Sequence, residues 1–324
     1  MRAEAKAKMT AIVHTATRAV TVDLSCPISL ALELDFAGGH SGRGASGLAT
    51  APMPTRAQPR HFDAPAATSR PYAVPGFSGS VATGASCNCD VITVIPHCNG
   101  THTEGVGHLT REPFDAYRLV PAGLTEALLL TVAPTAAARE PGESTEPAPR
   151  AGDRLITRRA LETAWAPYAD RANTAPLALV IRTRHEARTR RDAEPSTSSA
   201  VPDRARDHNS ATPDRSHGAA APAPYLTREA ALLLVERGIE HLVIDLPSID
   251  REHDEGRLTA HRIFFGLPAN SRELDQATRR QATVTEFADI PDALADGSYL
   301  LAIQVPAWRG DAVPSRPLLY PIQQ

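Results

Sequence analysis

The stretch TREAALLLVERGIEHLVIDLP (227–247) joins a helix directly to a strand, and this pairing decides the fold class. Apolar residues recur at helical spacing over 227–238. Thr227 suits the N-cap, and Gly238 suits the C′ position, where a left-handed backbone favours glycine. The run IEHLVIDLP (239–247) follows at once and is apolar enough to predict a buried strand.

A second strand upstream completes a βαβ unit. PLALVIRT (176–183) has strand character, and the helix at 227–238 would return the chain to the strand at 239–247. Such a unit implies parallel pairing and a right-handed crossover. The tract between, 186–224, has almost no large apolar residue, so burial cannot offset the entropy of ordering it. We therefore expect a flexible insertion within the crossover and not a domain boundary.

Further regular elements flank this unit on both sides. Strands are predicted at 19–25, 124–133, 282–290 and 297–308, and helices at 155–169 and 259–266. Residues 37–60 and 134–151 are rich in small residues and proline without an apolar period, which predicts two more flexible insertions. We expect one α/β domain over residues 1–324, decorated by these loops.

The composition of the chain predicts a cytoplasmic protein whose partner is a small molecule. The 324 residues carry a formal net charge of −3, which gives no footprint for nucleic acid or an anionic membrane. The N-terminus lacks the apolar core of a secretory signal, and the longest apolar runs are too short to span a bilayer. Four cysteines in so long a chain do not predict a disulfide framework. Cys87 and Cys89 are expected to be buried thiols on one face of a strand.

The stretch HCNGTHTEGVGH (97–108) holds three histidines and a glutamate, after DVITVIP (90–96), which we expect to be a buried strand. Catalytic zinc sites use about three protein ligands, mostly imidazole nitrogens and carboxylate oxygens, plus a water. On an extended segment His102 and Glu104 point to the same side and can reach one ion together. The stretch therefore predicts a metal site.

GTHTEGVGH (100–108) resembles the signature H-x-G-T-H-x-D-x-P-x-H of the cyclase-like metal-dependent hydrolases, which include bacterial kynurenine formamidase (arylformamidase) and isatin hydrolase. Four more segments are similar to family segments and lie in family order: VDLSCPIS (22–29), DLPSIDREH (245–253), TAHRIFFG (259–266) and TVTEFADI (283–290). The resemblance runs from about residue 20 to the C-terminus, apart from the insertions.

The resemblance implies a role for each matching residue. His102 and Glu104 would be ligands of a Zn²⁺ or Mn²⁺ ion, with Glu104 able to bridge two ions. His108 would serve a second metal or move protons, so His108 and Glu104 are the expected catalytic residues. His261 and Glu286 would belong to the second metal position or its surroundings.

Two departures from the signature leave one ligand open. Glu104 stands where the family has aspartate, and Cys98 stands where the first histidine should be, with His97 one place early. Either Cys98 supplies a thiolate, or a bulge lets His97 reach the ion, or this position holds no ligand. Asp250 and His253, in the segment DLPSIDREH, are expected to be solvated turn residues.

The fold that the resemblance implies is a swivelling β/α/β arrangement, with a mixed sheet forming a partly closed barrel and helices outside. It also implies a homodimer or homotetramer in which loops of one subunit line the neighbouring site. In this chain we expect the N-terminal loop 37–75 to do so through HFDAP (61–65).

The activity that the resemblance implies is hydrolysis of a carbon–nitrogen bond in a small linear or cyclic amide. An arylformamidase of tryptophan catabolism is the model, with metal-activated water attacking the carbonyl carbon. The alternative is a divergent member that binds a metal or a small molecule without turnover, and the replacements at Cys98 and Glu104 motivate it.

Overall fold

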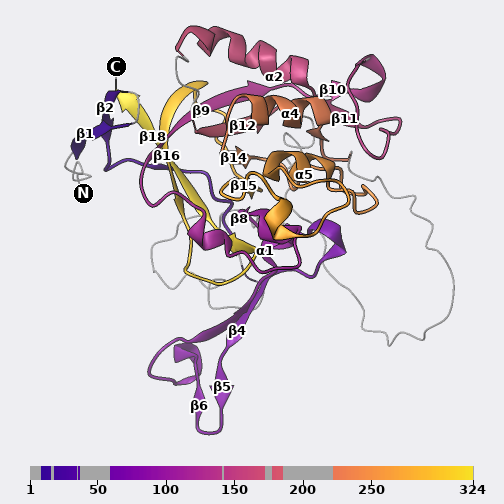
Figure 1. Cartoon of the computed structure of the whole chain (residues 1–324). Helices are drawn as coiled ribbons and strands as arrows, with labels where there is room; N and C mark the ends of the chain where they lie inside the picture. Colours follow the sequence, from indigo (N-terminus) through magenta and orange to yellow (C-terminus); the bar gives the residue numbers. More distant parts are fainter. Residues whose placement is uncertain are drawn as a thin grey trace, which may run out of the picture.

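A computed structural model gives the architecture and describes residues 9–15, 18–34, 36, 59–140, 142–171, 177–184 and 222–323. An 11-stranded mixed sheet dominates it (Figure 1). Its path runs through β1 (Thr10–His14), β2 (Ala19–Asp23), β18 (Arg316–Gln323), β16 (Gly297–Gln304), β9 (Thr125–Val132), β12 (Ala178–Thr183), β14 (His241–Ile244), β15 (Thr283–Glu286), β8 (His102–Glu104) and β17 (Ala312–Pro314), with β3 (Ile28–Ser29) paired to β18. The central strands β9, β12, β14 and β15 run parallel, and the flanking pairs are antiparallel.

The predicted βαβ unit is confirmed. β12 and β14 pair in parallel, and α4 (Arg228–Glu236) lies between them in sequence. The Thr227 hydroxyl accepts a hydrogen bond from the Ala230 N–H as the N-cap, and Gly238 has a φ of +70° just after the helix. Most of the intervening tract, residues 185–221, lies outside the described residues.

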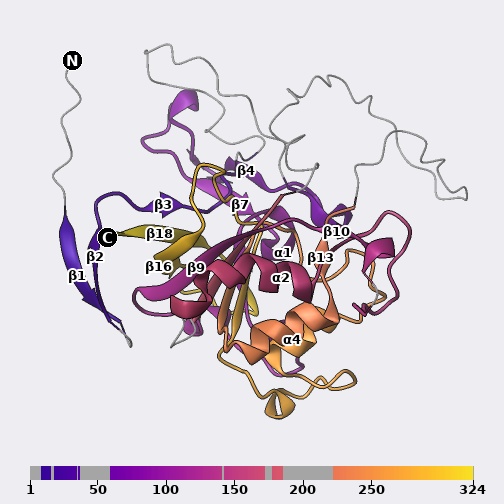
Figure 2. The ribbon, with the colours of Figure 1, turned by 90° about the horizontal axis from the view of Figure 1, so that it is seen from above.

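Alternate side chains of the parallel strands feed two separate cores. Leu128, Leu130, Leu179, Ile181 and Leu242 pack on one face with the helices α2 (Arg158–Trp165), α4 and α5 (Thr259–Phe265). Figure 2 shows α2 and α4 along one side of the sheet. The other face joins β12 and β14 to β16 and β18 in a second core. Burial on both faces explains why these strands are almost continuously apolar.

The other predicted strands and the helix at 259–266 are confirmed by β2, β9, β15, β16 and α5. The helix expected at 155–169 begins later, because residues 154–156 form β11 (Arg154–Ile156) and Thr157 caps α2. β11 pairs with β13 (Tyr225–Leu226) and with β10 (Thr135–Ala136), so part of the segment 134–151 has regular structure. Residues 37–58 lie outside the described ranges.

The prediction that 90–96 forms a buried strand is wrong. β7 (Asp90–Thr93) pairs with β4 (Thr68–Pro71), and the hairpin of β5 (Ala73–Val74) and β6 (Phe77–Ser78) extends the pair into an arm that projects from the body (Figure 1). Ile92 is 56% exposed, because the sheet of the arm has only two strands. Cys87 and Cys89, expected to be buried, precede β7 and are exposed.

The mixed sheet and the outer helices are as expected, but no closed barrel is found among the described residues. The strand path is open, with β1 at one end and β17 at the other. Short helical turns complete the described chain: α1 (Pro96–Asn99), η2 (His61–Asp63), η3 (Val81–Thr83), η4 (Val106–His108), η5 (Ala116–Arg118), η6 (Ala137–Arg139), η7 (Ala166–Arg171) and η8 (Leu274–Gln276). In the part of the chain that the structure describes, every helix is too short or too polar to cross a membrane.

His241 makes the stability of this sheet depend on pH. Its ring is buried at the start of β14, with Nδ1 2.9 Å from the Thr283 hydroxyl, and burial lowers its pKa from 6.5 to about 4. Between these values the unfolded chain binds the proton and the folded chain does not, so stability falls as pH drops through this window. We expect His241 to account for about 3 kcal/mol of lost unfolding free energy at pH 4.

Urea unfolding at pH 7 and pH 4 tests this expectation. His241→Gln should lose less stability on acidification than the parent, whereas the exposed control His253→Gln should lose as much as the parent. Equal pH dependence in all three proteins would contradict the assignment.

Candidate metal centre

Residues 97–108 form three consecutive elements and not one loose loop. His97 lies on α1, His102 and Glu104 on β8, and His108 at the end of η4. The glycines allow close packing here, and none of them has a left-handed backbone conformation. A Cβ on Gly107, for example, would lie 2.5 Å from the Phe114 carbonyl oxygen. Tight packing therefore fixes the positions of the histidines.

Strand pairing brings His102, Glu104 and Glu286 onto one face. β8 lies between β15 and β17, and Glu286 of β15 is directly opposite His102. Residues opposite each other share a face, and so do residues two apart on a strand. All three side chains are buried, and Glu286 is held by the Ile249 N–H, which donates to Oε1 at 2.7 Å.

His261 reaches the same place from the first turn of α5. Asp250 accepts hydrogen bonds from the backbone N–H groups of Ala260 and His261, and its Oδ2 lies 2.7 Å from His261 Nδ1. Asp250 is buried, so the expectation that it is a solvated turn residue is wrong, while His253 is exposed as expected. The Asp250 carboxylate therefore accepts from two backbone N–H groups in the first turn of α5 and also orients the His261 ring.

Glu104 is the centre of the cluster. Its Oε1 lies 2.6 Å from His261 Nε2. Its Oε2 lies 2.9 Å from His97 Nδ1, 3.8 Å from His102 Nε2 and 4.0 Å from His108 Nδ1. The two carboxylate oxygens thus face different groups of histidines, which is the arrangement a bridging ligand needs.

Glu286 lies close to both His102 and His261 in the cluster. Its Oε2 lies 3.5 Å from His102 Nε2, and its Oε1 lies 3.4 Å from His261 Nε2. The structure therefore brings together all six residues that the sequence selected as ligands: His97, His102, Glu104, His108, His261 and Glu286.

The Cys98 thiol belongs to no group of three or more potential ligand atoms within the described residues, whereas His97 belongs to two. Adjacent residues on a helical turn point about 100° apart, so only one of them can face Glu104. Burial raises the pKa of the Cys98 thiol, which disfavours the thiolate. The placement favours His97.

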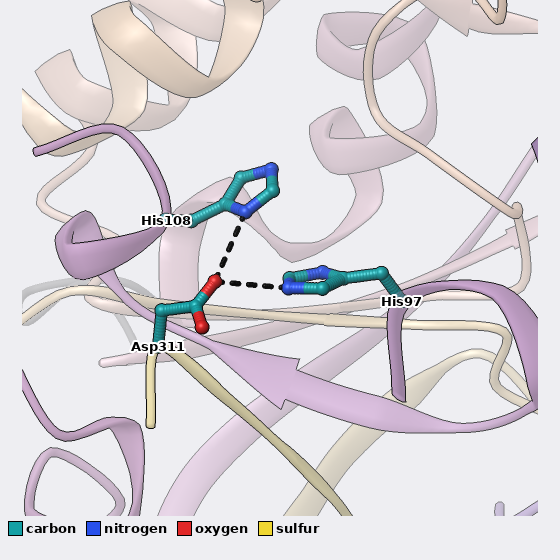
Figure 3. Close-up of side chains that lie close together, drawn as sticks. All are labelled: His97, His108 and Asp311. Carbon is teal, nitrogen blue, oxygen red and sulfur yellow. Dashed lines mark hydrogen bonds and ion pairs between the residues drawn. The ribbon is translucent and has the colours of Figure 1, made fainter. Parts of the chain in front are cut away.

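Asp311 joins the cluster and was not selected from the sequence. Its Oδ2 lies 3.0 Å from His97 Nε2 and 3.3 Å from His108 Nδ1 (Figure 3). It precedes β17, whose antiparallel pairing with β8 brings it to the site. An isolated aspartate in a turn gives no local signal, so only the strand pairing could have revealed it.

Opposite charges within the cluster shift the pKa values of its members. Burial alone would raise the pKa of Glu104, but the positive charges of His108 and His261 hold it well below its usual range. Burial alone would lower the pKa of His261, but Glu104 and the hydrogen bond to Asp250 hold it well above its usual range. The hydrogen bond to Asp311 and the charge of Glu104 likewise outweigh burial and raise the pKa of His97 to about 10.

Three buried atoms in the middle of this cluster lack hydrogen-bond partners: His102 Nε2, Glu104 Oε1 and His261 Nε2. The last two lie close together, but not in a geometry that makes a hydrogen bond. The ion pair offsets part of the cost of burying Glu104 Oε1 and His261 Nε2, whereas His102 Nε2 carries the cost of about 1–3 kcal/mol of an unpaired buried polar group. A divalent cation fits, because it would accept all three lone pairs.

Three donor sets could hold an ion. One is partly buried and consists of His97, His108 and Asp311. The other two contain Glu104: His97 and His102 complete the first, and His261 and Glu286 complete the second. Mixed imidazole and carboxylate donors suit Zn²⁺ and Mn²⁺. Glu104 is common to two of the sets, so the geometry accommodates one ion or a bridged pair.

Comparison with known proteins places the chain in a family. A family model described as "Putative cyclase" matches residues 22–251, which is more than half of the chain, so the protein belongs to the cyclase family. The match includes β8 but ends before His261, Glu286 and Asp311. Among curated proteins, no relative matches the chain.

Several solved structures are similar to the chain at low identity. Isatin hydrolase A from Labrenzia aggregata, bound to benzyl benzoate, is 13% identical with a TM-score of 0.48, and the match covers 92% of this chain and 94% of that one. A potential metal-dependent hydrolase with cyclase activity is 12% identical with a TM-score of 0.47, over 92% and 99% of the two chains. A predicted metal-dependent hydrolase from Bacillus stearothermophilus is 12% identical with a TM-score of 0.44, and the match covers 91% of this chain and 98% of that one. The family assignment rests on the family match and not on these structures.

Loss of a buried ligand should weaken metal binding more than it weakens folding. We expect His102→Ala to lower Zn²⁺ affinity by at least the roughly 10–100-fold that removal of a supporting partner of a ligand costs. Competition with a chromophoric chelator measures the affinity. His253→Ala is the matched control and should bind as the parent does. Parent-like binding by His102→Ala would remove His102 from the ligand set.

Proposed function

We propose that the protein is a metal-dependent hydrolase that cleaves a carbon–nitrogen bond of a small linear or cyclic amide, as an arylformamidase does. The observation that carries the proposal is the group of unpaired buried donor atoms around Glu104, in a chain of the cyclase family.

His102, Glu104, His97, His261 and Glu286 would hold the metal, which would be Zn²⁺ or Mn²⁺. When bound, the ion supplies a Lewis acid that polarises a carbonyl and lowers the pKa of water towards neutrality. Asp250 fixes the ring of His261 so that Nε2 faces Glu104. Burial of Glu104 and His261 keeps bulk water from the ligand atoms on that side.

His108 and Glu104 are the residues that would move protons. The His108 side chain is 26% exposed, and its Nδ1 lies between Glu104 and Asp311. A partly exposed imidazole can take a proton from the attacking water and deliver it to the leaving nitrogen. Glu104 can share this task, because its Oε2 faces His108.

The second candidate is a divergent member that binds a metal or a small molecule without turnover. Cys98 at the first histidine position and Glu104 at the aspartate position favour it. The two candidates separate on turnover, since both bind metal. Metal binding without hydrolysis across a panel of amides and lactones would support the second candidate.

Removal and return of the metal tests the hydrolase. After dialysis against a chelator, we expect hydrolysis of N-formylkynurenine or isatin to disappear and to return with Zn²⁺ or Mn²⁺. His108→Ala should lower kcat/KM by about 10²–10⁴-fold, the usual contribution of a positioned acid or base. The exposed His14→Ala is the control. Negligible metal by elemental analysis, or activity that survives the chelator, would refute the proposal.

The proposal includes a homodimer or homotetramer, with a reducing compartment such as the cytoplasm as its place. All four cysteines are free, which suits that compartment. The projecting arm exposes large apolar side chains at Tyr72, Val74, Val81 and Ile92. Apolar surface gathered on one projection is typical of a protein–protein contact. HFDAP (61–65), by contrast, lies against its own chain, where Asn99 donates to the carbonyl oxygens of Pro59 and Pro65.

A charge on the arm should therefore dissociate the oligomer. We expect Val74→Asp combined with Ile92→Asp to lower the molar mass measured by light scattering after size-exclusion chromatography. Leu177→Asp places a charge on another exposed apolar residue, outside the arm, and should leave the mass unchanged. A parent protein that is monomeric at micromolar concentration would contradict the oligomer.

A further inference from the structure

Asp311 is held rigidly beside the centre although it lies far from the signature in sequence. Its carbonyl oxygen accepts a hydrogen bond from the Gly105 N–H at 3.2 Å, directly after Glu104. The next residue, Ala312, is paired with Glu104 in the β17–β8 register. The backbone thus fixes the Asp311 side chain relative to Glu104 through two neighbouring strand contacts.

His97 has a different partner at each ring nitrogen. Nε2 lies 3.0 Å from Asp311 Oδ2, and Nδ1 lies 2.9 Å from Glu104 Oε2 (Figure 3 shows the first contact). An ionised carboxylate can only accept, so Asp311 holds the hydrogen on Nε2. The lone pair of a neutral His97 ring is then on Nδ1, which faces the interior donor set.

The same oxygen of Asp311 also accepts from His108 Nδ1, at 3.3 Å. The two imidazole rings lie with centroids 4.3 Å apart, and one carboxylate orients both. For His108 the hydrogen is held on Nδ1, which leaves Nε2 as the nitrogen that can accept a proton.

We propose that Asp311 is a positioning residue: it selects the tautomer of His97 that presents Nδ1 to the metal, so that His97 can replace the histidine missing at position 98. Metal-bound histidines commonly donate their other ring N–H to a carboxylate, which fixes the ring and increases its basicity. The inference rests on the proposed function only in taking His97 as a ligand.

The alternative, in which Asp311 is itself a ligand with His97 and His108, fits the contacts less well. Asp311 Oδ2 already accepts from two donors, and the side chain is 46% exposed. Within the cluster, the buried atoms that lack a hydrogen bond are on His102, Glu104 and His261, and Glu104 faces the other ring nitrogen of His97, Nδ1. The ion's position is indicated by those atoms.

Asp311→Ala and Asp311→Asn test the role, with Asp275→Asn as a control that removes one exposed carboxylate elsewhere. We expect Asp311→Ala to bind Zn²⁺ about 10–100-fold more weakly than the parent. Asp311→Asn should recover part of that loss, because its amide oxygen still accepts a hydrogen bond. The control should bind as the parent does.

Two spectroscopic readouts separate positioning from ligation. The visible spectrum of the Co²⁺-loaded Asp311→Ala protein should keep the band positions and intensities of the parent, since no ligand is lost. In ¹⁵N spectra of the Zn²⁺-loaded parent, the His97 resonance, assigned with His97→Gln, should show Nδ1 bound and Nε2 protonated, and this pattern should weaken in Asp311→Ala.

Parent-like Zn²⁺ affinity in Asp311→Ala, or a Co²⁺ spectrum that shows a changed coordination number, would overturn the inference. Melting curves of the metal-free variants establish that each is folded. If Asp311→Ala is not folded, the Zn²⁺ affinity of Asp311→Asn is the measurement that tests the inference. A parent protein that binds metal but hydrolyses no amide would contradict the proposed function and would not affect this inference. An active, metal-loaded parent whose Zn²⁺ affinity is unchanged in Asp311→Ala would contradict this inference and would support the proposed function.

Discussion

The buried carboxylate of Glu104 is the constraint on which the rest of the site depends. A charge removed from water is costly unless it is paired and hydrogen-bonded, and an aliphatic sheet interior offers neither. Glu104 is 1% exposed, and histidines from three different elements face its two oxygens. These contacts make a buried charge tolerable and at the same time gather nitrogen donors around one point.

Strand order provides this arrangement. β8 is short, yet β15 and β17 flank it, so one strand carrying His102 and Glu104 receives Glu286 from one neighbour and Asp311 from the other. The parallel strands beside it are fixed by cores on both faces. A rigid sheet therefore sets the ligand positions, which suits a centre whose donors must converge to within a fraction of an ångström.

The sequence predicted the structure correctly where interactions between residues close in the chain determine it. The N-cap Thr227 and the C′ residue Gly238 marked the helix α4. The resemblance of ordered segments to the family selected six candidate site residues, and all six lie together in the structure. Prediction from the sequence failed where tertiary contacts decide the structure. Ile92 belongs to an apolar run typical of a core strand but lies on the arm. Asp250 was expected to be a solvated turn residue, but it accepts hydrogen bonds from the first turn of α5. Asp311 reaches the site through a pairing with β8, which lies about 200 residues earlier in the chain.

The residues at the two departures from the signature, His97 and Glu104, contact each other. Glutamate extends the carboxylate by one methylene, and the first histidine moves back by one residue; the result is that His97 Nδ1 and Glu104 Oε2 lie 2.9 Å apart. Asp311 holds the far side of the same ring. In a site that no longer binds an ion, nothing would maintain a carboxylate that orients His97. A supported displacement is what a site that still binds an ion requires, so these replacements weigh for compensation and against decay.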